Sequence, residues 1–313
     1  MNEPSVPALS RPQSVLNRVF QGPRGLRSGW RLILFLLFFV GIQYVLDNTL
    51  IHRLVALGLI KPIADGVLTP VAVLAEDGVD LIALMVAMAV MGRVERRSAG
   101  DYGLPLRRAF RSQFWRGTAV GFLAVSAIML TIFAGRGYSF GTLALTPFSA
   151  LLYAVVWMFV IFLAAVVEEL TFRGYAQFTL TDGIGFWPAT LLTSAAFGIS
   201  HRENPGDVWP GVVAVVLFGV FQCLTRRRTG TLWFAVGMHA AFNYGEAFVS
   251  SAKDSGFQIE GHLLTSEMHG SKWLTGGPFG PEGSVPALVV VLVLLALFAL
   301  LGPVSPRPAR GSA

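Results

Sequence analysis

The chain has 313 residues, of which 54% are hydrophobic and only 13% are charged, with a formal net charge of +6. Soluble domains carry about 25% charged residues, so this composition excludes an ordinary soluble protein, and the apolar and aromatic content excludes a disordered one. The single cysteine, Cys223, excludes an intramolecular disulfide and a cysteine-based metal site. We therefore expect an all-α polytopic membrane protein in which Cys223 is a buried, inert thiol.

Residues 1–29 are polar, basic and rich in proline and glycine, which predicts a flexible cytosolic arm and not a cleaved signal peptide. From residue 30 onward, apolar runs recur that approach the roughly 20 residues needed to cross a hydrocarbon core of ~30 Å. About eight transmembrane helices are predicted, at residues 30–50, 71–91, 114–134, 147–180, 186–201, 208–225, 230–249 and 285–302.

Basic residues indicate how these helices are oriented, because lysine and arginine accumulate on the cytosolic side of membrane proteins. With the N-terminus in the cytosol, most of the 24 lysines and arginines fall on that side, including the triplet Arg226, Arg227 and Arg228. We interpret the triplet as an orientation signal in contact with lipid headgroups. Both termini are thus predicted to be cytosolic in a multi-pass protein of the cell membrane. Residues 251–284 then form a polar loop on the outer side, for which the sequence suggests no role.

Three formal charges interrupt the fourth apolar run, in the stretch AAVVEELTFRGYA at residues 164–176. A charge at bilayer depth costs at least ~2.5–3.5 kcal/mol, so charged groups there indicate function by default. Glu169 and Arg173 are four residues apart and share a helix face, where they can pair. Glu168 is turned about 100° away, which predicts that it points into a cavity with a partner of its own.

Other polar residues reach a similar depth on two further helices. At a rise of ~1.5 Å per residue, Glu168 and His201 each lie ~22 Å from the predicted cytosolic end of their helix. On the seventh predicted helix, His239 lies ~14 Å and Asn243 ~20 Å from the cytosolic end. This convergence requires the fourth helix to continue past Arg173. If it does, catalytic residues gather in the core of the helix bundle.

These residue types suit the attack of water on an amide. A glutamate beside a histidine in a dry cavity can activate water, either directly or on a metal. A second pair, His239 and Asn243, can donate hydrogen bonds to an oxyanion or complete a metal shell. The sequence contains neither HExxH nor GxSxG, which argues against zincins and the common serine hydrolases.

At these residues the chain resembles the CPBP family, the CAAX proteases and bacteriocin-processing enzymes, also called the Abi family. The motif EExxxR corresponds to Glu168, Glu169 and Arg173. FxxxH corresponds to Phe197 and His201, and HxxxN to His239 and Asn243. The three motifs occur in order over roughly residues 145–250.

The resemblance implies an intramembrane endopeptidase of CAAX-protease type, with an eight-helix fold. It implies that Glu168 and His201 activate water, that His239 and Asn243 stabilise the oxyanion, and that Glu169 and Arg173 hold the site. Such relatives are described both as metalloproteases and as metal-free enzymes. Zn²⁺ would be bound by Glu168, His201 and His239, and a metal-free mechanism stays open. The expected partners are membrane lipid and a membrane-associated or peptide substrate, and no nucleic acid.

The predicted organisation has five parts. They are a basic arm at 1–29, N-terminal transmembrane helices at 30–143, the catalytic helices at 144–250, the outer loop at 251–284, and a last transmembrane helix and tail at 285–313. Two alternative functions remain. A proton-coupled transporter is disfavoured because no inverted repeat is visible. A catalytically silent immunity or scaffold protein is disfavoured because all six predicted site residues are present.

Overall fold

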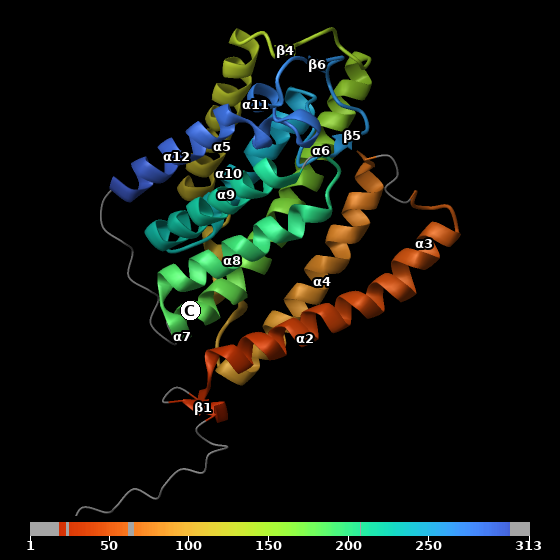
Figure 1. The fold of residues 1–313 in the computed structure, drawn as a ribbon. Helices are drawn as coiled ribbons and strands as arrows, with labels where there is room; N and C mark the ends of the chain where they lie inside the picture. Colours follow the sequence, from red (N-terminus) through yellow and green to blue (C-terminus); the bar gives the residue numbers. More distant parts are fainter. Residues whose placement is uncertain (1–18, 23–24, 62–65, 207, 301–313) are drawn as a thin grey trace, which may run out of the picture.

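A computed structural model describes the chain except for residues 1–18, 23–24, 62–65, 207 and 301–313. The described part is built mainly from helices (Figure 1), which confirms the predicted all-α membrane fold. The α-helices are α2 (Ser28–Leu46), α3 (His52–Ala56), α4 (Pro70–Glu95), α5 (Ser112–Ala134), α6 (Pro147–Glu169), α7 (Gln177–Ile184), α8 (Phe186–Ser200), α9 (Val208–Thr229), α10 (Trp233–Asn243), α11 (Lys272–Thr275) and α12 (Val285–Leu300). Shorter helical turns are η1 (Asp47–Ile51), η2 (Ala99–Tyr102), η3 (Leu106–Arg108), η4 (Leu170–Ala176), η5 (His201–Glu203), η6 (Tyr244–Val249), η7 (Gly277–Phe279) and η8 (Pro281–Gly283).

Strands contribute little to the described structure. The antiparallel pair β1 (Gln21–Gly22) and β2 (Gly25–Leu26) lies in the part of the predicted N-terminal arm that is described, while residues 1–18 of that arm lie outside the described residues. The other two pairs involve residues 251–284, which the sequence predicts as the outer loop and which we call the outer segment. β3 (Val67–Leu68) runs parallel to β5 (Gln258–Ile259), and β4 (Tyr138–Ser139) is antiparallel to β6 (Glu267–Met268).

Four continuous helical stretches in the described residues are long and apolar enough to cross a membrane. They are Ser28–Ala56, Ser112–Ala134, Pro147–Ile184 and Trp209–Thr229, and the apolar helix Val285–Leu300 is shorter. Their outer faces carry exposed aliphatic and aromatic side chains, such as Phe148, Leu151 and Leu152 on α6, as contact with lipid requires. The predicted segments 186–201 and 230–249 form helices too short for this criterion by themselves.

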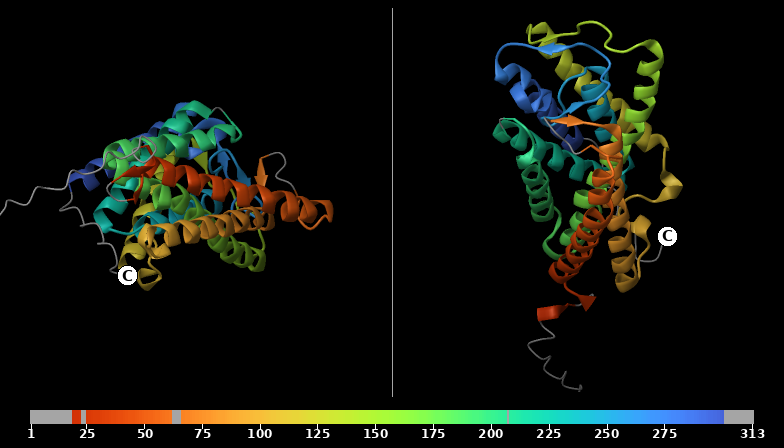
Figure 2. Two further views of the ribbon diagram at one scale, coloured as in Figure 1. Left: turned by 90° about the horizontal axis from the view of Figure 1, so that it is seen from below. Right: turned by 90° about the vertical axis from the view of Figure 1, so that its right-hand side faces the viewer.

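Two groups of helices build the core. On one flank α2 and α4 pack side by side (Figure 2), and with α7 they bury an apolar cluster around Phe35, Met88 and Tyr175. A second cluster lies between α5, α9, α10 and α12, around Ile128 and Phe221. Helix α6 contacts both α4 and α10, so its polar residues lie between the two groups.

The fourth predicted helix continues past Arg173, as the convergence of polar groups requires, but it is not straight. The π-helical segment η4 separates α6 from α7, and Gly174 within it has a non-helical ψ of −109°. A kink of this kind leaves carbonyl groups without helical partners. Arg226 of α9 donates to the carbonyls of Arg173 and Gly174, and also to that of Tyr102. Arg226 therefore supports the kink from within the protein, which differs from the predicted headgroup contact.

Helix α10 approaches α5 closely, because glycines line their contact. A Cβ atom on Gly117 would lie 2.1 Å from the carbonyl oxygen of Phe234, and one on Gly121 would lie 2.1 Å from that of Met238. From the other side, a Cβ on Gly237 would lie 2.3 Å from the carbonyl oxygen of Phe114. Small residues spaced four apart allow such close helix packing in membranes. The contact determines where α10 lies, and with it the position of His239.

The outer segment 251–284 has defined structure, comprising β5, β6, α11, η7 and η8. It packs against the helix bundle: the indole of Trp157 in α6 donates to the carbonyl of Glu260, and the ring of Phe279 is fully buried. Figure 1 and the right-hand view of Figure 2 place this segment at the end of the bundle opposite β1 and α7.

Candidate active site

The two adjacent glutamates lie at the end of α6 in different surroundings. Glu169 is fully buried, and its Oε1 lies 3.2 Å from Nη1 of Arg173, which is also fully buried. This confirms the predicted ion pair across one helical turn. The side chain of Glu168 is 35% exposed and faces a cavity. A helix turns by about 100° per residue, so neighbouring carboxylates necessarily face different environments here.

Arg173 is enclosed by an aromatic ring and a glycine. Its guanidinium carbon lies 3.9 Å from the centre of the Phe197 ring, a cation–π contact. A Cβ on Gly219 of α9 would lie only 2.9 Å from Nη2 of Arg173, so the absence of a side chain there leaves room for the guanidinium. The role of Gly219 has no signal in the sequence, because it depends on which helix α9 packs against.

His239 connects the two glutamates. Its Nδ1 lies 3.1 Å from Oε1 of Glu169, and its Nε2 lies 3.6 Å from Oε2 of Glu168. A carboxylate can only accept hydrogen bonds, so Nδ1 donates its proton to Glu169. Oε2 of Glu168 is buried and has no hydrogen-bond partner. Glu168 therefore lies beside the imidazole of His239, whereas the resemblance pairs it with His201. A protonated His239 can donate from both ring nitrogens.

His201 follows the end of α8 and is partly exposed to the same cavity. Its Nδ1 lies 2.8 Å from the carbonyl oxygen of Phe197. A carbonyl is only an acceptor, so Nδ1 carries the proton and Nε2 of the neutral ring keeps its lone pair. The Phe197 ring also packs edge-on against both imidazoles, with centroids 4.7 Å from His201 and 6.3 Å from His239. Phe197 thereby sets the orientation of three groups of the site.

Asn243 lies one turn after His239 at the end of α10 and lines the cavity. Its Oδ1 is buried without a hydrogen-bond partner. An unsatisfied buried amide costs roughly 1–3 kcal/mol, so a partner entering the cavity would relieve that cost.

The cavity has a volume of about 570 Å³, within the range of ligand sites. Glu168, His201, His239 and Asn243 all line it, while Glu169 and Arg173 lie behind them. The structure therefore brings the six predicted site residues together, four at the cavity wall and two as their support.

Sequence reasoning missed a second set of acidic residues in this cavity. Glu76, Asp77 and Asp80 of α4 line it, as do Asp254 and Glu282 of the outer segment, and the described lining includes no lysine or arginine. Burial, with the charges of Glu282 and Glu168, raises the pKa of Asp254 above its ordinary value. The sequence signal that could have identified the acidic residues of α4 is the one that identified Glu168 and Glu169, because all of them are carboxylates within an apolar run.

The three predicted zinc ligands do not form a compact donor set in this structure. Among the described residues, one group of acidic side chains brings three ligand atoms within 4.8 Å of one another, and it consists of Glu246, Asp254 and Glu282. The ligand atoms of Glu168, His201 and His239 do not meet this criterion. Tetrahedral zinc binds its ligands at about 2.0–2.2 Å, which requires them to be closer. The arrangement of these three residues therefore does not fit a tetrahedral zinc site.

Comparison with protein families gives a match at these same helices. Residues 149–245 match the family described as type II CAAX prenyl endopeptidase Rce1-like. No curated protein matches the chain. The matched range contains all three motifs, from Glu168 to Asn243, and the helices that carry them. Over the helices that carry the site, the chain is therefore similar to the type II CAAX prenyl endopeptidases.

Proposed function

We propose that the chain hydrolyses a peptide bond at membrane depth, with Glu168 as the general base. The observation that carries this proposal is that a carboxylate oxygen of Glu168 and a ring nitrogen of His239 face each other at the cavity. Oε2 of Glu168 and Nε2 of His239 lie 3.6 Å apart, too far for a direct hydrogen bond, and Oε2 has no other partner. A water molecule in the cavity can donate to Glu168, and an oxyanion beside it can accept from a protonated His239.

Glu168 takes a proton from this water as its oxygen attacks the carbonyl carbon of the substrate. The proton then passes to the leaving amine nitrogen as the C–N bond breaks. His201 assists the first step, because the lone pair of its Nε2 is free to accept from the same water. The hydrogen bond from Nδ1 to the Phe197 carbonyl supports this role, since it selects the tautomer that leaves Nε2 as the acceptor.

His239 and Asn243 stabilise the negative oxygen that forms on the carbonyl. His239 donates from Nε2, and the amide of Asn243 donates from Nδ2, both from the cavity wall. Preorganised donors of this kind supply some of the largest effects in catalysis. Glu169 supports the pair indirectly, because it accepts from Nδ1 of His239 while Arg173 neutralises it. Glu169 and Arg173 are thus positioning residues.

The charge of the cavity restricts the substrate. Acidic side chains from α4, α6 and the outer segment line it, and the described lining includes no lysine or arginine. Like charges brought together in a site of low polarity cost several kcal/mol. We infer that the preferred peptide segment is membrane-associated and carries basic or neutral side chains next to the cleaved bond.

The test is cleavage of a peptide reporter by the purified full-length protein in detergent. Glu168→Gln, which removes the base and keeps the shape, is expected to lower the rate at least about a hundredfold. Glu267→Gln is the matched control, because the Glu267 side chain is 75% exposed in the outer segment. A Glu168→Gln variant that cleaves at the rate of the control would contradict the proposed mechanism.

A second measurement separates the proposal from its alternatives. The wild-type protein is assayed against a peptide library with chelator and with added Zn²⁺. Activity that persists in chelator supports the mechanism derived from glutamate and histidine alone. Activity restored only by Zn²⁺ would contradict the metal-free form, and cleavage of no peptide under any condition would favour the scaffold or transporter reading.

A further inference from the structure

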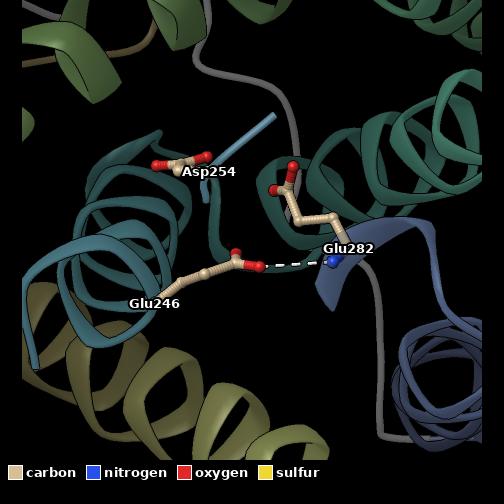
Figure 3. A group of neighbouring side chains, drawn as sticks. All are labelled: Glu246, Asp254 and Glu282. Carbon is tan, nitrogen blue, oxygen red and sulfur yellow. Dashed lines mark hydrogen bonds between the residues drawn. The ribbon is translucent and has the colours of Figure 1, made fainter. Parts of the chain in front are cut away.

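A second polar cluster lies beside the candidate active site, at the end of the bundle that carries the outer segment. Glu246 belongs to η6, which continues α10, Asp254 follows in the outer segment, and Glu282 lies in η8 just before α12. One carboxylate oxygen from each lies within 4.8 Å of the others. Figure 3 shows the three side chains converging from separate segments on a common space.

The hydrogen bonds within this cluster leave a buried carboxylate oxygen of Glu246 unsatisfied. Oε1 of Glu246 accepts from the backbone N–H of Glu282 at 3.2 Å, and Oε2 of Glu282 accepts from the Ser255 hydroxyl at 2.6 Å. Glu246 is nevertheless fully buried, and its Oε2 has no hydrogen-bond partner. A buried carboxylate oxygen without a donor carries a large desolvation cost, which a ligand at that position would offset.

The cluster also lacks a compensating charge. Within the part of the chain that the structure describes, no lysine or arginine forms an ion pair with Glu246, Asp254 or Glu282. Three carboxylates this close repel one another unless protons or a cation intervene. All their available donor atoms are oxygens, the ligands that hard cations such as Ca²⁺ prefer, and no nitrogen or sulfur ligand favours zinc.

We propose that Glu246, Asp254 and Glu282 bind one divalent cation of the calcium type. Two ligands on opposite sides of Ca²⁺ lie up to about 4.6–5.2 Å apart, given bond lengths of ~2.3–2.6 Å, and the cluster falls within this span. Ca²⁺ tolerates irregular coordination, whereas Mg²⁺ requires near-octahedral geometry with shorter bonds. Carboxylates drawn from three separate segments suit the more tolerant ion.

Such an ion would join the end of the α10–η6 helix, the outer segment and the start of α12. Glu246 lies three residues after Asn243 on the same continuous helix, and Asp254 and Glu282 line the same cavity as Glu168. The ion would therefore hold the outer segment over the cavity and fix the end of the helix that carries His239 and Asn243. This gives the segment 251–284 a structural role that does not depend on the proposed proteolysis.

The experiment measures cation binding and stability, both independent of proteolysis. The full-length protein in detergent is freed of metal with a chelator that is then removed. Calcium binding is measured by titration calorimetry, and thermal unfolding by tryptophan fluorescence, with CaCl₂ or MgCl₂ added. One equivalent of Ca²⁺ is expected to bind, and saturating Ca²⁺ to raise the Tm by at least about 3 °C.

Three variants each remove the charge of one proposed ligand: Glu246→Gln, Asp254→Asn and Glu282→Gln. Each is expected to weaken Ca²⁺ binding at least tenfold and to lose most of the Tm increase. Because they relieve repulsion, they should unfold no earlier than the wild type in chelator, so a lost response is not explained by misfolding. Glu267→Gln is the control and should respond like the wild type. A wild-type protein that binds no Ca²⁺, a response to Mg²⁺ alone, or variants that respond like the control would overturn the proposal.

Discussion

At the scale of the residue, the two neighbouring glutamates lie in different surroundings because their partners differ. Glu169 is enclosed with Arg173 and His239, whereas Glu168 is open to the cavity. Removing one partner of a buried ion pair leaves an uncompensated charge and typically costs about 3–5 kcal/mol. The stability of the site therefore depends on Arg173 more than on any surface ion pair, since those contribute about 0–1 kcal/mol.

The variant Arg173→Ala is accordingly expected to lower the free energy of unfolding by about 3–5 kcal/mol, measured by thermal unfolding in detergent. The double variant Glu169→Gln/Arg173→Met removes both charges and should regain most of that stability. It should still be inactive on a peptide reporter, because Nδ1 of His239 no longer faces a carboxylate. Unchanged stability of Arg173→Ala would show that the pair does not hold the site.

At the scale of the element, the position of the α10 helix depends on glycines that no catalytic motif includes. Gly117, Gly121 and Gly237 allow α5 and α10 to approach until backbone meets backbone. His239 lies one residue beyond Met238, whose carbonyl faces Gly121. A displacement of about 1 Å at the reacting groups can cost a hundredfold in rate, so a packing defect here should reach the chemistry.

We expect Gly121→Ala to destabilise the protein by about 1–3 kcal/mol through overpacking and to reduce reporter cleavage as well. Gly41→Ala on α2 is the matched control, because a Cβ there would meet nothing within 4 Å. That control should be neutral or stabilising by up to about 1 kcal/mol, given the helix propensity of alanine. Equal unfolding temperatures and rates for the two variants would argue against the close packing of α5 and α10.

At the scale of the whole molecule, the charge of the cavity is contributed by segments far apart in the sequence. The acids of α4 face Glu168 of α6, and Asp254 and Glu282 complete the lining from the outer segment. A peptide bound as we propose would therefore meet the combined field of several segments, even where it touches only one of them.

This field predicts a preference between two sets of reporters, one with lysine or arginine beside the cleaved bond and one with aspartate or glutamate there. The kcat/KM of the basic reporters should be at least about tenfold higher, which corresponds to a difference of ~1.4 kcal/mol in activation free energy. The combined variant Glu76→Gln, Asp77→Asn and Asp80→Asn should reduce the difference. A preference for acidic reporters, or one that the variant leaves unchanged, would contradict the proposed substrate class.

Much of this protein follows from the order of its residues. Apolar runs predict helices in lipid because the backbone must satisfy its own hydrogen bonds there. The pairing of Glu169 with Arg173 follows from helical spacing alone, and the burial of Cys223 follows from its apolar surroundings. These features are local, so a pattern of spacing and polarity is sufficient to predict them.

Only the tertiary structure decided the features that depend on how distant segments meet. The sequence does not indicate that Arg226 supports the kink at Gly174, that Gly219 makes room for Arg173, or that the outer segment brings Asp254 and Glu282 to Glu246. The physical reason is that most of these contacts join residues tens of positions apart, and their geometry depends on the packing of whole helices. The sequence determined which groups the membrane must hold together, and the packing determined which of them face one another.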